Sequence, residues 1–189
     1  MRVMSDDDAV SWCEGAGFLV DDTSSSTRVK PADAHGSRLR IGISGDATDI
    51  VGLAYVLMMT GVPDYEEDAF GGALIWLQRW EIWSESIDRV GYALVDGIRA
   101  RSEVARDMDA TPAQLFVGGE FIGAHTCLSL PMLFQWDAYF LPVHGHFAAF
   151  LSHEGHLDLV PRNQQGQQAI LQRFERWSPR EISAGARNE

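Results

Sequence analysis

Two histidines and two aspartates near the C-terminal end of the chain are the residues best suited to chemistry. His153 and His156 flank a Glu–Gly pair, and Asp137 and Asp158 lie in the alternating segments on either side. Imidazole and carboxylate groups at close range hold divalent metals such as zinc, or exchange protons with a substrate. The His-Glu-Gly-His run is not a zinc-protease motif, because that motif places its histidines four residues apart on a helix.

Three predicted antiparallel strands must position these side chains. Alternating apolar and polar residues indicate strands over 132–141, 146–153 and 156–160. We expect a first turn at 143–145 and a second at Glu154–Gly155, the latter as a two-residue hairpin loop.

The expected register decides which side chains share a face. With a two-residue loop, His153 faces His156 and Leu151 faces Asp158 across the second hairpin. The pairing predicts one core face, which includes Phe150, and one candidate binding face, on which Phe147 and Leu151 also lie. The candidate binding face carries Gln135, Asp137, Tyr139, His153, His156 and Asp158.

Three interpretations of this candidate face stay open. It is a solvated sheet face with scattered polar residues, a protein interface, or a site in which His153, His156 and Asp137 bind a metal or transfer protons. Convergence of the side chains in a pocket, with perturbed pKa values, would favour chemistry, whereas a flat open arrangement would favour an interface.

The remaining segments predict an α+β fold: a mostly antiparallel sheet of about five strands with helices packed on one face, and a C-terminal three-strand meander followed by a helix. Residues 1–37 are expected to form a helix and a partly mobile loop, residues 38–178 a single domain, and residues 179–189 a flexible tail. Within the domain we expect strands at 38–44 and 73–83, and helices at 47–60, 85–103, 120–129 and 163–176, with a further helix start at Thr111–Gln114.

Length and cysteine content agree with a domain that folds without disulfides. The chain has 189 residues, and 46% of them are hydrophobic, which suffices for a sizeable core. Cys13 and Cys127 are far apart in sequence and are expected to be free thiols in a reducing, cytoplasmic setting. We find neither a secretory signal pattern nor an apolar run of about 18 residues.

The net charge of the chain indicates which classes of partner to expect. The net charge is −12 at pH 7 and no cluster of basic residues suits a phosphate backbone, so we expect neither nucleic acid nor a membrane as partner. An acidic surface favours a basic protein instead. We therefore expect a small non-catalytic binding protein of the inhibitor or immunity type, without a cofactor. The alternative is a metal-dependent hydrolase that uses the His/Asp cluster with zinc or another divalent metal.

Overall fold

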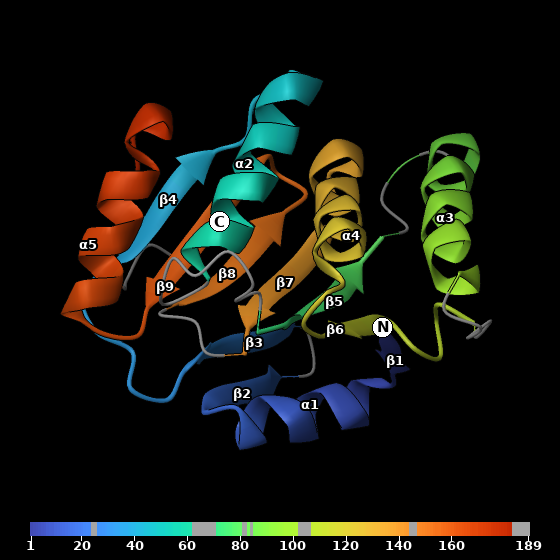
Figure 1. The fold of residues 1–189 in the computed structure, drawn as a ribbon, viewed down its shortest axis with the longest axis horizontal. Coiled ribbons are helices and arrows are strands. Elements are labelled where there is room, and N and C mark those ends of the chain that lie inside the picture. Colours follow the sequence, from blue (N-terminus) through green and yellow to red (C-terminus); the bar gives the residue numbers. More distant parts are fainter. Residues whose placement is uncertain are drawn as a thin grey trace.

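An eight-stranded antiparallel sheet forms the centre of the molecule (Figure 1). The computed structural model describes residues 1–23, 26–61, 71–80, 83, 85–101, 107–143 and 147–182. The α+β class is confirmed, but the sheet has eight strands rather than about five. In spatial order they are β1 (Arg2–Met4), β6 (Ala113–Phe116), β5 (Ala73–Arg79), β7 (Asp137–Pro142), β8 (Phe147–Ser152), β9 (His156–Pro161), β4 (Arg38–Gly42) and β10 (Arg180–Ile182).

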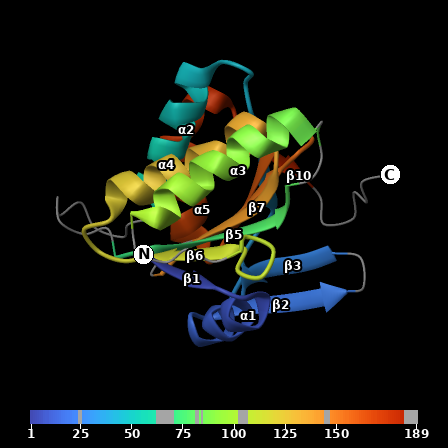
Figure 2. The same ribbon diagram turned by 90° about the vertical axis from the view of Figure 1, so that its right-hand side faces the viewer.

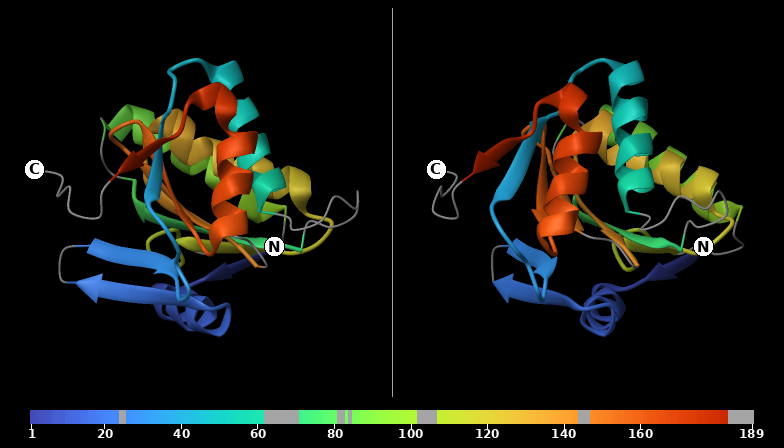
Figure 3. Two further views of the ribbon diagram at one scale, coloured as in Figure 1. Left: turned by 90° about the vertical axis from the view of Figure 1, so that its left-hand side faces the viewer. Right: turned by 60° about the vertical axis from the view of Figure 1, so that its left-hand side comes forward.

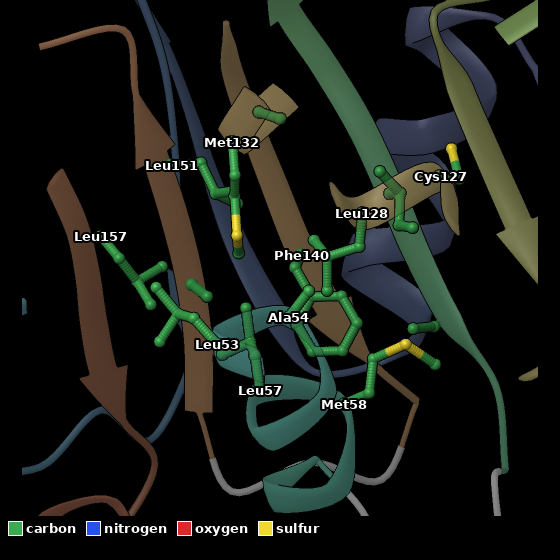
Figure 4. Close-up of a cluster of buried hydrophobic side chains, with 14 of the residues drawn as sticks. Leu53, Ala54, Leu57, Met58, Cys127, Leu128, Met132, Phe140, Leu151 and Leu157 are labelled. Carbon is green, nitrogen blue, oxygen red and sulfur yellow. The ribbon is translucent and has the colours of Figure 1, made fainter. Parts of the chain in front are cut away.

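Four helices cover the first face of this sheet. They are α2 (Ala47–Thr60), α3 (Glu85–Ala100), α4 (Phe121–Phe134) and α5 (Gln164–Arg173), the last followed by a short 3-10 helix at Glu175–Trp177. Figure 4 shows the core between α2, α4 and the meander of β7, β8 and β9, where Leu53, Met58, Phe140, Leu151 and Leu157 meet. All five side chains are buried, so this layer contains the main hydrophobic core.

The second face carries a smaller layer, which the sequence interpretation missed. Helix α1 (Asp6–Gly15) and a hairpin of β2 (Phe18–Thr23) and β3 (Ser26–Pro31) lie on the side of the sheet opposite α2 and α5 (Figure 3). Phe18 and Val29 pack there against Trp76, Tyr139 and their neighbours. The helix expected near the N-terminus is present, but the segment expected as a loop contains this hairpin.

Side-chain caps explain why several helices begin where the sequence predicts. Asp46 accepts hydrogen bonds from the backbone N–H groups of Thr48 and Asp49, at 2.8 and 3.1 Å, and so starts α2. Asn163 accepts one from Gly166 at 2.8 Å and starts α5. Each cap satisfies donors that have no partner within the helix.

Three segments differ from the expected elements. Residues 113–116 form strand β6 instead of a helix, and residues 132–134 complete α4 instead of opening a strand. Arg180–Ile182, expected in the tail, form β10 against β4. The acidic loop at 64–68, positions 144–146 and the end of the chain from 183 onward lie outside the described residues.

Both cysteines are buried free thiols. Burial raises the pKa of the Cys13 and Cys127 thiols to about 12, so neither thiolate forms near neutral pH. In the described part of the chain, no helix has the length and apolar character needed to cross a membrane.

Candidate functional site

A three-residue loop, not a two-residue loop, joins β8 to β9. Ser152 pairs with His156, and the N–H of Gly155 donates to the carbonyl of Ser152 at 3.0 Å. Gly155 has a φ of +78°, the left-handed conformation that closes such a loop and that glycine adopts without strain. The expected pairing of His153 with His156 is therefore wrong by one residue.

That single residue turns the whole of β8 over relative to the prediction. Phe150, assigned to the core face, lies opposite Asp158 and Tyr139 on the second face. Phe147 and Leu151, assigned to the candidate face, point into the main core instead. The strands β7 and β9 keep their predicted orientation, so Asp137, Tyr139, His156 and Asp158 share the second face.

Asp158 is the buried centre of an ionic cluster that joins β9 to β4. Its carboxylate accepts two hydrogen bonds from Arg40, Nε to Oδ1 at 2.7 Å and Nη2 to Oδ2 at 2.9 Å, and a third from Arg38 at 3.2 Å. The Asp158 side chain is only 4% exposed, against 29% for Arg40 and 49% for Arg38. This bidentate geometry is the strong form of an arginine–carboxylate pair.

His156 lies beside this cluster without a close hydrogen bond to it. Its Nε2 is 3.7 Å from Oδ2 of Asp158, and its Nδ1 is 3.8 Å from Oε2 of Glu154. Burial lowers the pKa of His156 from its usual 6.5, and Arg40 adds to the effect, while Asp158, Glu154 and Asp137 oppose it. His156 is thus held toward its neutral form.

Asp137 and His153 form a second, separate pair. Oδ1 of Asp137 lies 2.8 Å from Nδ1 of His153 and also accepts the backbone N–H of His153 at 2.8 Å. The carboxylate therefore orients the imidazole through Nδ1 and fixes the first residue of the loop to the start of β7. The His153 side chain is 30% exposed.

The other two predicted residues do not join either group. Gln135 ends α4 in a left-handed conformation, with a φ of +51°, and lies before β7 rather than in the sheet. Tyr139 is buried beneath the β2–β3 hairpin, where its hydroxyl donates to the carbonyl of Thr27 at 3.1 Å. Burial raises the pKa of Tyr139 to about 12, so it stays a neutral donor.

Sequence reasoning missed the arginines of this face. Arg38 and Arg40 alternate with Leu39 and Ile41 along β4, and that alternation does place the arginines on one side of a strand. The sequence pattern does not show which residue the two arginines pair with, because β4 pairs with β9, more than 100 residues away along the chain. Exposed Arg180 of β10 pairs opposite Arg40 and adds a third cation to the row.

Fixed charge pairs occupy the centre of this face. Both oxygens of Asp158 are taken by guanidinium groups, and among the described residues no group of three or more His, Cys, Asp or Glu side chains is arranged to hold a metal ion. What the arrangement offers is a rigid surface of alternating charges, which suits recognition of a complementary surface.

Comparisons of the chain with protein-family models, with curated proteins and with solved structures gave no match.

Proposed function

We propose that the chain is a small non-catalytic binding protein whose partner docks on the polar face. We define the polar face as Arg38, Arg40, Asp137, His153, Glu154, His156, Asp158 and Arg180. The observation that carries the proposal is the bidentate engagement of Asp158 by Arg40. Both oxygens of this carboxylate accept hydrogen bonds from guanidinium groups, which leaves it poorly placed to bind a metal and fixes the neighbouring side chains in place.

The mixture of charges on the polar face supports a protein as the partner. Arg38 and Arg180 lie toward the β4–β10 edge, whereas Glu154 lies on the β8–β9 loop with its side chain 53% exposed. A uniformly charged polymer finds no continuous complement there, while a folded protein surface can match both signs. The net charge of −12 makes a basic protein the partner that long-range attraction favours.

We therefore propose an inhibitor- or immunity-type module: an acidic protein that is attracted to a basic partner by its net charge and docks on it through a face that carries both signs. In such a complex the buried ion pairs of the polar face supply rigidity. The half-exposed charges at its edges set the rate of association and the choice of partner.

A matched pair of charge reversals tests the proposal. Affinity capture with the immobilised protein supplies candidate partners, and each is then purified and titrated by calorimetry. Glu154→Arg, on the polar face, should weaken binding by about tenfold or more. Asp109→Arg changes the net charge equally at an exposed site before β6 and should leave the affinity nearly unchanged.

The control separates a docking surface from a general effect of charge. Equal loss of affinity in both variants would mean that net charge alone drives binding, and equal retention would mean that the partner docks elsewhere. Either result contradicts the assignment of the polar face.

One observation supports the alternative of a metal-dependent hydrolase. The contact between Asp137 and Nδ1 of His153 is the carboxylate–histidine arrangement that often orients a zinc ligand, with Nε2 left to coordinate. In that arrangement Asp137 supports the ligand rather than binding the metal itself, and His153 with His156 supplies the nitrogen ligands.

A further inference from the structure

Two arginines face each other where β10 joins β4. Arg180 pairs directly opposite Arg40, so the two side chains leave the same side of the sheet. Arg38 lies two residues from Arg40 on β4 and therefore points to that side as well. Like charges at directly opposed positions destabilise a strand pair. β10 nevertheless pairs there, at the outer edge of the sheet, where Figure 3 shows it as the red arrow beside β4.

The guanidinium groups of Arg38 and Arg40 meet at one carboxylate oxygen. Nη1 of Arg38 and Nη2 of Arg40 lie 3.2 and 2.9 Å from Oδ2 of Asp158. In the described part of the chain, Asp158 is the only acid that forms an ion pair with either arginine, and Arg180 forms none. Glu154, on the β8–β9 loop, has only a weaker electrostatic effect on Arg40. Three cations therefore share one carboxylate.

This local excess of positive charge stands out in a chain with 27 acidic and 15 basic residues. The layer of α1, β2 and β3 lies on the same side of the sheet (Figure 2), but the row stays open to solvent, since Arg38 is 49% exposed and Arg180 is exposed as well. A position that breaks a local rule without compensation inside the fold is often a functional site. The compensation that this row lacks is negative charge.

We propose that Arg38, Arg40 and Arg180 bind a phosphate-class dianion, and that the bound anion stabilises the pairing of β10 with β4. A planar guanidinium group matches the oxygens of phosphate and holds them through two parallel hydrogen bonds. One dianion offsets the two positive charges that Asp158 leaves uncompensated. Because Asp158 already fixes Arg40, little side-chain freedom is lost there on binding.

The coupling to β10 follows from the weak attachment of this strand. It has three residues, and besides its pairing with β4 it is held by Glu181. The carboxylate of Glu181 accepts hydrogen bonds from Oγ of Ser37 at 3.2 Å and from Nε2 of Gln167 at 3.3 Å, both at the surface. Such an edge strand opens at low cost. An anion that needs Arg180 beside Arg38 therefore stabilises the paired state by mass action.

The anion site occupies one edge of the polar face, but it does not rest on the proposed protein partner. The proposed function is tested through Glu154, whereas the anion site is tested through Arg38 and Arg180 in the absence of any partner. Failure of one therefore leaves the other standing.

An NMR titration of inorganic phosphate into the isotope-labelled protein, at about pH 7.5 and constant ionic strength, tests the site. The backbone amides of residues 38–40 and 180–182 should shift and saturate with a dissociation constant of about 1 mM. Arg38→Gln and Arg180→Gln should each weaken binding at least about fivefold. Arg2→Gln removes an exposed arginine from β1, the strand at the opposite edge of the sheet, and should keep the wild-type affinity.

Two further probes define the class of anion. Glycerol phosphate should bind at least as tightly as inorganic phosphate if the natural ligand is a phosphate ester, and less tightly if it is phosphate itself. Acetate carries one charge and two oxygens, so it should bind at least about tenfold more weakly than phosphate.

Hydrogen exchange tests the coupling to β10. With a dissociation constant of about 1 mM, about 20 mM phosphate should slow the exchange of the amides that pair β10 with β4 by up to about twentyfold. Without phosphate, these amides should exchange more slowly in Arg180→Gln than in the wild type, because the like-charged pair is gone.

Three results would overturn the site: no saturable shift at these amides, equal weakening by Arg2→Gln, or acetate binding as tight as that of phosphate. Phosphate binding that leaves the exchange of the β10 amides unchanged would overturn the coupling to the strand.

Discussion

At the scale of single residues, the polar face depends on Asp158, whose carboxylate is almost fully buried between two arginines. Removing one partner of such a pair costs more than the pair contributes, because the remaining charge is left desolvated. Arg40 makes two short hydrogen bonds to Asp158 and Arg38 makes one longer one, and Arg40 is the less exposed of the two. The two arginines should therefore contribute unequally.

We expect Arg40→Ala to lower the free energy of unfolding by about 2 kcal/mol, since it leaves Asp158 with one weaker cationic partner. Arg38→Ala should cost less than about 1 kcal/mol, because the side chain is half exposed and water replaces its contact. Urea unfolding of both variants beside the wild type measures the difference. Equal losses would show that the bidentate geometry does not stabilise the fold.

His156 makes the stability depend on pH. Burial lowers the pKa of its imidazole in the folded protein, so the unfolded chain binds the proton more readily. Stability is then fully present above pH 6.5 and falls as the pH drops below that value, as the unfolded state takes up protons.

Replacing His156 tests this linkage. Unfolding free energies measured between about pH 7.5 and pH 5 should fall less steeply for His156→Gln than for the wild type. Identical slopes in the two proteins would mean that His156 is protonated equally in the folded and unfolded states.

At the scale of elements, α3 is placed by close packing against the ring of Trp136. A Cβ atom added at Gly91 would lie 2.4 Å from two atoms of that ring, so the helix and the ring need a glycine there. By contrast, a Cβ atom added at Gly52, in α2, would have no neighbouring atom within 4 Å. Substituting each glycine by alanine therefore distinguishes the effect of packing from the effect of helix propensity.

Gly91→Ala should destabilise the protein by about 1–3 kcal/mol through overpacking, in spite of the better helix propensity of alanine. Gly52→Ala should be neutral or stabilise it by up to about 1 kcal/mol. Thermal unfolding of both variants measures whether each substitution raises or lowers the stability. A stabilised Gly91→Ala protein would contradict the close approach of α3 to Trp136.

Elements with strong local signals were predictable from the sequence, and those defined by distant partners were not. The bounds of α2 follow from the Asp46 cap and the stop at Gly61, and both are local. Strand β10 has only three residues, and the six-residue strands β2 and β3 show no clear alternation of apolar and polar residues, so tertiary packing defines them. The end of α4 was assigned to a strand because a short apolar run fits either period.

In the candidate site, too, the features that depend on distant partners could not be predicted from the sequence. Asp137, His156 and Asp158 were placed on the correct face, because alternation along β7 and β9 fixes their side. The length of the loop at Gly155 was misjudged by one residue, and that error moved His153 into the sheet and inverted β8. No local pattern pairs Arg40 with Asp158, since the two belong to strands far apart in the chain.

At the scale of the whole molecule, the sheet separates two surfaces with different chemistry. The polar face lies on β4, β10 and the meander, whereas exposed apolar residues of α3 such as Val90 and Leu94 lie on the helical side. The chain carries a net charge of −12, which attracts a cationic partner over a long range. We propose that the polar face serves recognition of a protein partner rather than metal chemistry, since Asp158 is held by Arg38 and Arg40 and Asp137 is held against His153.

The most direct test of that claim is a calorimetric titration of zinc into chelator-treated protein, beside a His153→Ala/His156→Ala double variant. The account predicts no binding tighter than about 100 µM and the same weak signal from both proteins. Micromolar or tighter zinc binding that disappears in the double variant would contradict the account. It would establish the histidines of the polar face as ligands of a metal site.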